Sequence, residues 1–136
     1  MAISLNFFMD SSLTQPLGTT LPIDREIGGA PVDVPLWLGS SSPSRVFSPS
    51  TDAQITVSVL DTSPADGWAA GDITLALTQS GLATATPAAP LPIAAQINSG
   101  IQGAVSFWLR FNGQSATPKT ASDLQLITNA VKEYSL

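Results

Sequence analysis

Three aspartates in one short loop are the residues whose type and spacing come closest to a metal site. Asp61, Asp66 and Asp72 lie within 12 residues of each other, and carboxylate oxygens are ligands that calcium prefers. An EF-hand loop, however, needs oxygen ligands at its first, third and fifth positions and a glutamate at its twelfth. Here Ala65 and Asp72 stand at the fifth and twelfth positions. Turn-forming Asp and Gly residues account better for this loop, so we predict no metal and no cofactor.

The chain lacks the residues on which most enzymatic catalysis depends. It contains no His and no Cys, which excludes Ser-His-Asp and Cys-His arrangements and the usual zinc sites. Glu26 and Glu133 are the only glutamates, and most aspartates stand beside turn-forming residues, so no carboxylate pair for glycoside hydrolysis is indicated. Lys119 and Lys132 stand in polar stretches that do not favour a Ser–Lys dyad. We therefore predict no catalytic residue and no enzyme.

The charge balance excludes two further classes of partner. The 136 residues include 5 Lys and Arg against 10 Asp and Glu, a net charge of −5. So few basic residues cannot neutralise phosphates, and we expect neither nucleic acid nor membrane as a partner. The segment 1–9 has no basic residue before its apolar stretch, which is not typical of a signal peptide.

Three tryptophans are the main candidates for binding. Trp37, Trp68 and Trp108 could lie in the core, in a subunit interface or on a platform that stacks against sugars. Trp108 is out of phase with Phe107 and Leu109, so it faces outward if they face the core. Arg110 faces the same way, and Trp and Arg are enriched at the centres of protein interfaces.

The distribution of charge is uneven. The 37 residues from Ile73 to Leu109 carry no charged side chain, whereas exposed surfaces normally carry many. Burial against other chains would explain this stretch, and a neutral Ser/Thr/Ala surface without a partner is the alternative. From the first explanation we predict an interface that contains a set of apolar, aromatic and basic residues: Trp37, Leu91, Ile93, Ile101, Trp108 and Arg110.

Short alternating segments predict an all-β fold. Apolar and polar residues alternate, or apolar runs end at turn signals, over residues 3–7, 34–38, 45–47, 55–59, 73–77, 82–86, 93–97 and 105–111. Residues 124–134 predict one or two further strands, although 123–134 also suits a short helix. Strands at this spacing favour an antiparallel β-sandwich, immunoglobulin-like or jelly-roll-like.

The N-terminal part differs in character from the rest. Residues 10–35 hold several prolines and glycines, which predicts either a surface loop or an extended arm that touches a neighbouring subunit. We therefore divide a single domain into an arm with the first strands (1–50) and a sandwich core (51–136).

Residues 51–136 resemble the small β-sandwich modules of tailed-bacteriophage virions. The resemblance rests on the order GDITLAL, GLATATP, LPIA, INSG and AVSFWLRF, on the Gly/Ala/Thr/Ser bias and on the absence of cysteine. It implies a non-enzymatic, homo-oligomeric capsid decoration or cement protein that is assembled in the host cytoplasm and binds the major capsid protein or other virion proteins. A neck or tail component is the alternative within this class, and a carbohydrate-binding module is the alternative outside it.

Overall fold

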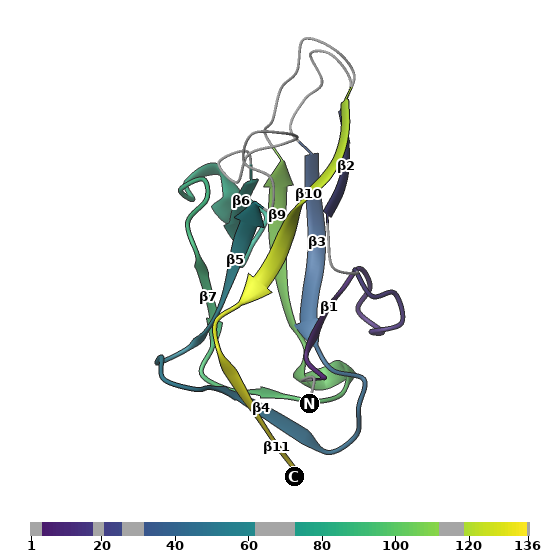
Figure 1. Cartoon of the computed structure of the whole chain (residues 1–136), viewed down its shortest axis with the longest axis vertical. Helices are drawn as coiled ribbons and strands as arrows, with labels where there is room; N and C mark the ends of the chain where they lie inside the picture. The colour runs from purple at the N-terminus through teal and green to yellow at the C-terminus, as the bar shows by residue number, and fades with distance from the viewer. Residues whose placement is uncertain (1–3, 18–20, 26–31, 62–72, 112–118, 136) are drawn as a thin grey trace.

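The chain folds into antiparallel β-sheets with almost no helix. The computed structural model describes residues 4–17, 21–25, 32–61, 73–111 and 119–135. These residues form eleven strands and two short 3-10 helices, η2 (Ser80–Ala83) and η3 (Ile101–Gly103) (Figure 1). Every strand pairing among them is antiparallel. The predicted all-β class is confirmed.

The first sheet has four strands in the order β1-β3-β9-β6. They are β1 (Asn6–Phe8), β3 (Val32–Gly39), β9 (Val105–Phe111) and β6 (Ile73–Ala76). In β9, Phe107, Leu109 and Phe111 are buried while the residues between them are exposed or half-buried, which is the alternation that its sequence predicts.

The second sheet has the order β2-β10-β5-β7. Its strands are β2 (Leu21–Arg25), β10 (Lys119–Thr128), β5 (Ile55–Asp61) and β7 (Leu91–Ala94). Strand β7 contains Pro92 and lies at the edge of the sheet. Proline has no backbone N–H to donate, and an edge strand tolerates this because it is paired on one side only.

A three-stranded sheet completes the fold, in the order β11-β4-β8. It consists of β11 (Val131–Ser135), β4 (Arg45–Pro49) and β8 (Ile97–Asn98). The chain passes from β10 to β11 through Asn129, whose side chain accepts a hydrogen bond from Thr56 N at 2.9 Å and donates to Gln54 O at 2.9 Å and to Asp52 Oδ2 at 2.8 Å.

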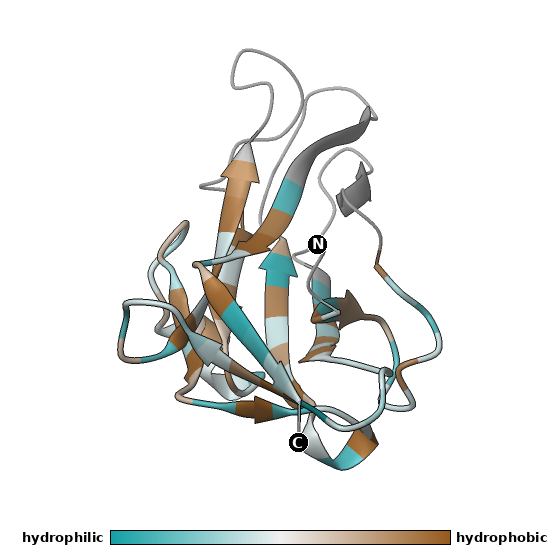
Figure 2. Cartoon of the chain, turned by 60° about the horizontal axis from the view of Figure 1, so that its bottom comes forward, coloured by the Kyte–Doolittle hydropathy of each residue, from teal (hydrophilic) through white to brown (hydrophobic). Residues whose placement is uncertain are grey.

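All three sheets contribute to one hydrophobic core. Its side chains lie on strands that alternate between apolar and polar residues (Figure 2). The buried members are Leu36, Leu38, Phe47, Ile55, Val57, Ile73, Leu75, Ile93, Ile97, Phe107, Leu109, Phe111 and Leu126. Because Leu36, Leu38 and Phe47 come from the first fifty residues, the core draws on both sides of the predicted division at residue 50.

One local prediction is wrong. Residues 82–86 were expected to form a strand, but η2 begins at Ser80, and Thr84 N donates a hydrogen bond to Gly81 O at 3.2 Å. The strands predicted for 124–134 are confirmed over the alternative helix, because β10 and β11 occupy this segment. Within the proline-rich stretch 10–35, β2 pairs with β10, and β3 begins at Val32.

Candidate interaction surface

The outer face of the first sheet gathers three of the six predicted interface residues. Directly opposed residues of antiparallel strands point to the same side of a sheet. The register pairs Asp33 with Arg110, Pro35 with Trp108 and Trp37 with Ser106. The side facing the core carries Leu36, Phe107 and Leu109. The opposite side therefore points away from the core. We call it the Trp37–Trp108 face, and it consists of Asp33, Pro35, Trp37, Ser106, Trp108 and Arg110.

The two tryptophans are diagonal neighbours on this face. Trp37 is opposite Ser106, two residues along β9 from Trp108, and diagonal pairs in such sheets are about 7–8 Å apart. Both side chains are half-buried. The alternation of β9 predicted the outward direction of Trp108, and the pairing of β3 with β9 brings Trp37 beside it. The surface is therefore aromatic.

An ion pair at one end of the face holds Arg110 in place. Arg110 Nε donates to Asp33 Oδ1 at 2.7 Å, and Nη2 donates to Oδ2 at 3.1 Å. Gln79 Nε2 also donates to Asp33 Oδ2, at 3.3 Å. The exposed fractions of the Arg110 and Asp33 side chains are 26% and 17%, so the pair is partly sheltered.

The pair shifts the acidity of both partners. The hydrogen bonds from Arg110 lower the pKa of the Asp33 carboxyl, and the same contact raises the pKa of the Arg110 guanidinium. Both groups are therefore held in their charged forms. Asp33 was not among the predicted interface residues, although the two-residue spacing of Asp33, Pro35 and Trp37 predicts a shared side of the strand for all three.

Neighbouring segments limit the extent of the face. On the β6 side, η2 packs against β6 and β9, and a Cβ added to Gly81 would lie 3.4 Å from the Ala76 Cβ. Ala76 and Thr74 share the side of Trp108 and Arg110 yet are buried. On the β1 side, Leu13 lies against Gly39 and is itself buried. The open part of the sheet is the strip around the two tryptophans.

The other three predicted interface residues lie apart from this face. Leu91 and Ile93 are on β7 in the second sheet. Ile93 is 9% exposed and belongs to the core, so its side chain packs within this chain and offers little surface to a partner. Leu91 is half-buried against the core, whereas Ile101 in η3 is 61% exposed.

The uncharged stretch 73–109 is buried at some positions and exposed at many others. All of β6 is buried, as are Leu82, Ile93, Ile97, Phe107 and Leu109. Its exposed large apolar residues are Leu77 and Ile101, and the other exposed positions are mainly neutral, such as Thr78, Gln79 and Ser80. Burial inside the chain thus accounts for part of the missing charges, and the exposed positions of the stretch form an uncharged surface.

A polar cluster fastens the start of the described chain to its last strand. Glu133 Oε1 accepts hydrogen bonds from the Ser4 backbone N, at 3.0 Å, and from the Ser4 hydroxyl. Ser40, which is fully buried, donates from Oγ to Ser4 Oγ at 3.2 Å. The bond from the Ser4 hydroxyl is the main reason that the pKa of Glu133 is lowered. The cluster's role is to hold the segment before β1 in place.

Two of the three aspartates considered as calcium ligands lie outside the residues that the structure describes. Asp66, Trp68 and Asp72 lie in 62–72, outside the described residues. Among the residues that the structure does describe, no group of three or more His, Cys, Asp or Glu side chains could hold a metal ion. Within the same residues there is no helix of sufficient length and hydrophobicity to cross a membrane.

Comparison with known proteins identifies no family for this chain. No family model, curated protein or solved structure matches the chain.

Proposed function

We propose that the chain is a two-layer β-sandwich that serves as a structural protein of a tailed-bacteriophage virion, as a capsid decoration or cement protein. In this proposal the Trp37–Trp108 face adheres to the major capsid protein, to another virion protein or to a sister subunit. The observation that carries the proposal is the gathering of Trp37, Trp108 and the paired Arg110 on one outward sheet face. Aromatic residues and Arg dominate the energetics of protein interfaces.

The chemistry of the face supports adhesion over catalysis. The carboxylate of Asp33 is already bound by Arg110 and Gln79, so it is poorly placed to act as a general base. The strip around Trp37 and Trp108 is aromatic and can be desolvated at low cost, and the ion pair at its end can stay paired while it is covered. The virion assignment itself rests on the sequence resemblance.

The first test measures binding to particles. Purified chain is added to empty capsids of the phage that encodes it, and co-sedimentation and thermal resistance of the capsids are recorded. We expect wild-type protein to bind and to raise the resistance to heat. We expect Trp108→Ala to weaken binding by at least about tenfold, since loss of a central aromatic contact costs about 2 kcal/mol or more.

The matched control is Tyr134→Ala. Tyr134 is also aromatic and is 49% exposed, but it lies on β11 in the third sheet. Equal losses for both variants would contradict a role for the Trp37–Trp108 face. A strictly monomeric wild-type protein without affinity for particles would contradict the proposal as a whole. Copy number then separates decoration, with hundreds of copies, from a neck or tail ring with roughly six to twelve.

The diagonal placement of the two tryptophans favours a second candidate, a carbohydrate-binding module. Neighbouring indole rings on a flat sheet can stack against successive sugar rings, and Arg110 can donate hydrogen bonds to hydroxyls. Titrating the intrinsic tryptophan fluorescence with soluble polysaccharides tests this candidate. A saturable change that Trp37→Ala abolishes would favour the glycan, and an unchanged emission would dismiss it.

A further inference from the structure

A proline-rich turn follows η2 on the surface of the chain. Residues 86–92, here called the 86–92 segment, read Thr-Pro-Ala-Ala-Pro-Leu-Pro, and five of the seven are exposed. Ala89 N donates to Thr86 O at 3.2 Å and closes the turn. Ala88, in the third position of the turn, has a φ of 63°, which is uncommon for a residue other than Gly. The turn therefore holds its two central residues, Pro87 and Ala88, in a fixed and exposed conformation.

From Pro87 to Pro90 the segment has no free backbone donor. Pro87 and Pro90 have no backbone N–H. Ala88 N donates to Ile73 O at 2.9 Å, and Ala89 N is used within the turn. Each of these four residues still carries a carbonyl oxygen that can accept hydrogen bonds. This part of the surface can therefore accept hydrogen bonds from a partner but has none to donate.

The Trp37–Trp108 face offers the opposite set of groups. The indole N–H of tryptophan can only donate, and within the described residues no hydrogen bond engages that of Trp37 or of Trp108. Arg110 uses Nε and Nη2 on Asp33, so Nη1 has no acceptor in the same part of the chain. Both carboxylate oxygens of Asp33 already accept hydrogen bonds. The face thus combines aromatic rings with unused donors.

Neither of these two surfaces carries a net charge. The 86–92 segment has no ionisable side chain, and on the face Asp33 and Arg110 compensate each other. Each copy of the chain carries a net charge of −5, so the approach of two copies is opposed where their acidic surfaces meet. It is least opposed where two neutral surfaces meet. The face and the segment therefore match in charge as well as in hydrogen-bonding groups.

We propose that the Trp37–Trp108 face of one copy binds the 86–92 segment of a second copy. The indole N–H groups and Arg110 donate to carbonyl oxygens of the segment, and its proline rings pack against the tryptophans, as proline-rich segments do on other aromatic surfaces. The inference rests on the adhesive role proposed for this face, and it names the sister subunit as the partner. Because the face and the segment share no residue, the contact is head-to-tail and forms a ring or a filament.

The first test measures self-association of the full chain by analytical ultracentrifugation over a series of concentrations. We expect the wild type to associate. We expect Trp108→Ala and the double variant Pro87→Ser/Pro90→Ser each to weaken the association constant at least about tenfold. The two serines remove proline rings and add backbone donors to a segment that otherwise only accepts. A wild type that stays monomeric up to its solubility limit would overturn the proposal.

Mixing the two variants tests the head-to-tail arrangement. Trp108→Ala keeps the segment but has a damaged face, and the double proline variant keeps the face but has a damaged segment. We expect each variant alone to be monomeric and an equimolar mixture to form a 1:1 dimer that grows no further. A mixture that stays monomeric would overturn the arrangement. If Trp108→Ala does not fold, Ser106→Glu takes its place, because it puts a charged acceptor beside the donors at an exposed position of the same face.

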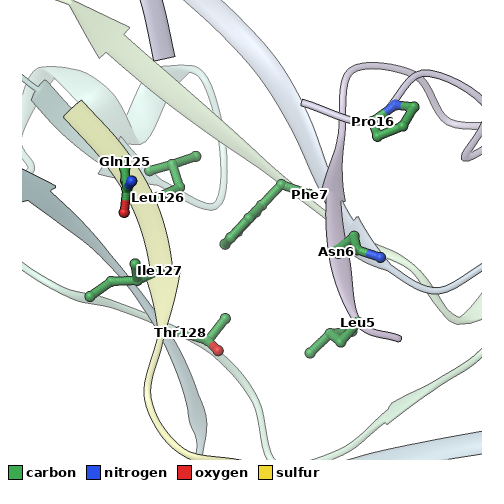
Figure 3. A pocket seen from close by; sticks show the side chains of 8 residues that line it. All are labelled: Leu5, Asn6, Phe7, Pro16, Gln125, Leu126, Ile127 and Thr128. Atoms are coloured by element: carbon green, nitrogen blue, oxygen red, sulfur yellow. The ribbon is translucent and has the colours of Figure 1, made fainter. Parts of the chain in front are cut away.

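Two control variants test the location of the contact. Pro43 is an exposed proline before β4. Ile127 is 37% exposed and lines a pocket of about 510 Å³ between β1 and β10 (Figure 3), which contains no residue of the face or of the segment. We expect Pro43→Ser and Ile127→Lys to leave the association constant within about twofold of the wild-type value. A loss in either control as large as that in Trp108→Ala would overturn the assignment to these two surfaces.

Capsid binding separates this inference from the proposed function. If the wild type binds capsids but does not self-associate, the inference is overturned and the proposed function stands. If the mixed variants dimerise but the wild type has no affinity for particles, the contact between copies stands and the virion assignment is overturned.

Discussion

Asp33 is an acidic residue diagonal to Trp108 across β3 and β9, its charge is balanced by Arg110, and Gln79 donates a further hydrogen bond to it. The three side chains come from β3, from β9 and from the residue before η2. Their contacts therefore fix the position of η2 relative to the sheet as well as the direction of the Arg110 guanidinium. A substitution of Asp33 should therefore alter both the position of η2 and the direction of the Arg110 guanidinium.

Acid should weaken this contact in a defined pH range. The pKa of Asp33 is lowered in the folded protein, so its contribution to stability is complete above its ordinary value near 3.9 and is lost as the pH falls through the lower folded value. We expect the free energy of unfolding of the wild type to exceed that of Asp33→Asn at pH 6, and the difference to shrink below about pH 4. Urea denaturation at several pH values measures it, and a constant difference down to pH 2 would contradict this account.

Glu133 should add to the same acid sensitivity. Its pKa is also lowered, first by the Ser4 hydroxyl and the Ser4 backbone N–H. Its protonation would release the segment before β1 in the same range of pH.

At the scale of elements, strands with strong local alternation were predictable from the sequence, whereas the segments that pack over them were not. Strand β9 was expected over its full length because Val105, Phe107, Leu109 and Phe111 alternate with other residues. Strand β6 has a similar pattern but is buried on both sides, because η2 folds back over it. That covering depends on a contact beyond the strand, and local periodicity carries no information on it.

The candidate site was likewise predictable only in part. The outward direction of Trp108 and Arg110 follows from β9 alone. The placement of Trp37 and Asp33 beside them depends on the pairing of β3 with β9, whose residues are some seventy positions apart. Ile93 was assigned to the interface because its stretch is uncharged, but an uncharged stretch is equally expected in a core.

A close approach between β3 and the residue before β9 offers a test at this scale. A Cβ on Gly39 would lie 2.8 Å from the Ala104 Cβ and 3.3 Å from Leu13 Cδ1. We expect Gly39→Ala to destabilise the fold by about 1–3 kcal/mol through overpacking. Urea denaturation of Gly39→Ala, Ala104→Gly and the double variant measures the coupling. A smaller cost of Gly39→Ala in the Ala104→Gly background would support the contact, and strict additivity would contradict it.

At the scale of the whole molecule, the three sheets depend on one core. Phe47 is fully buried on β4, the middle strand of the three-stranded sheet, and belongs to the same buried cluster as residues of both four-stranded sheets. The small sheet is thus part of the same cooperative unit as the two larger ones.

Truncating Phe47 should therefore destabilise the entire chain. We expect Phe47→Ala to cost about 3–5 kcal/mol, a large share of the roughly 5–15 kcal/mol typical of a domain. Calorimetry should show one transition at a lower Tm, and Tyr134→Ala, at a position 49% exposed on the neighbouring strand β11, should change stability by no more than about 0.5 kcal/mol. If Phe47→Ala does not fold, Phe47→Leu should show a smaller loss in the same single transition. Separate melting of the small sheet would contradict the shared core.

The position of β10 between β2 and β5 sets the order in which the protein can form. This interior strand begins at Lys119, while β2 begins at Leu21. The second sheet therefore stays incomplete during synthesis until β10 has left the ribosome, and β11 completes the third sheet later still. Pairings between such distant segments place folding in the range of about milliseconds to seconds. During that interval the apolar strands are exposed to other chains, so the yield of native protein should depend on the rate of synthesis and on chaperones.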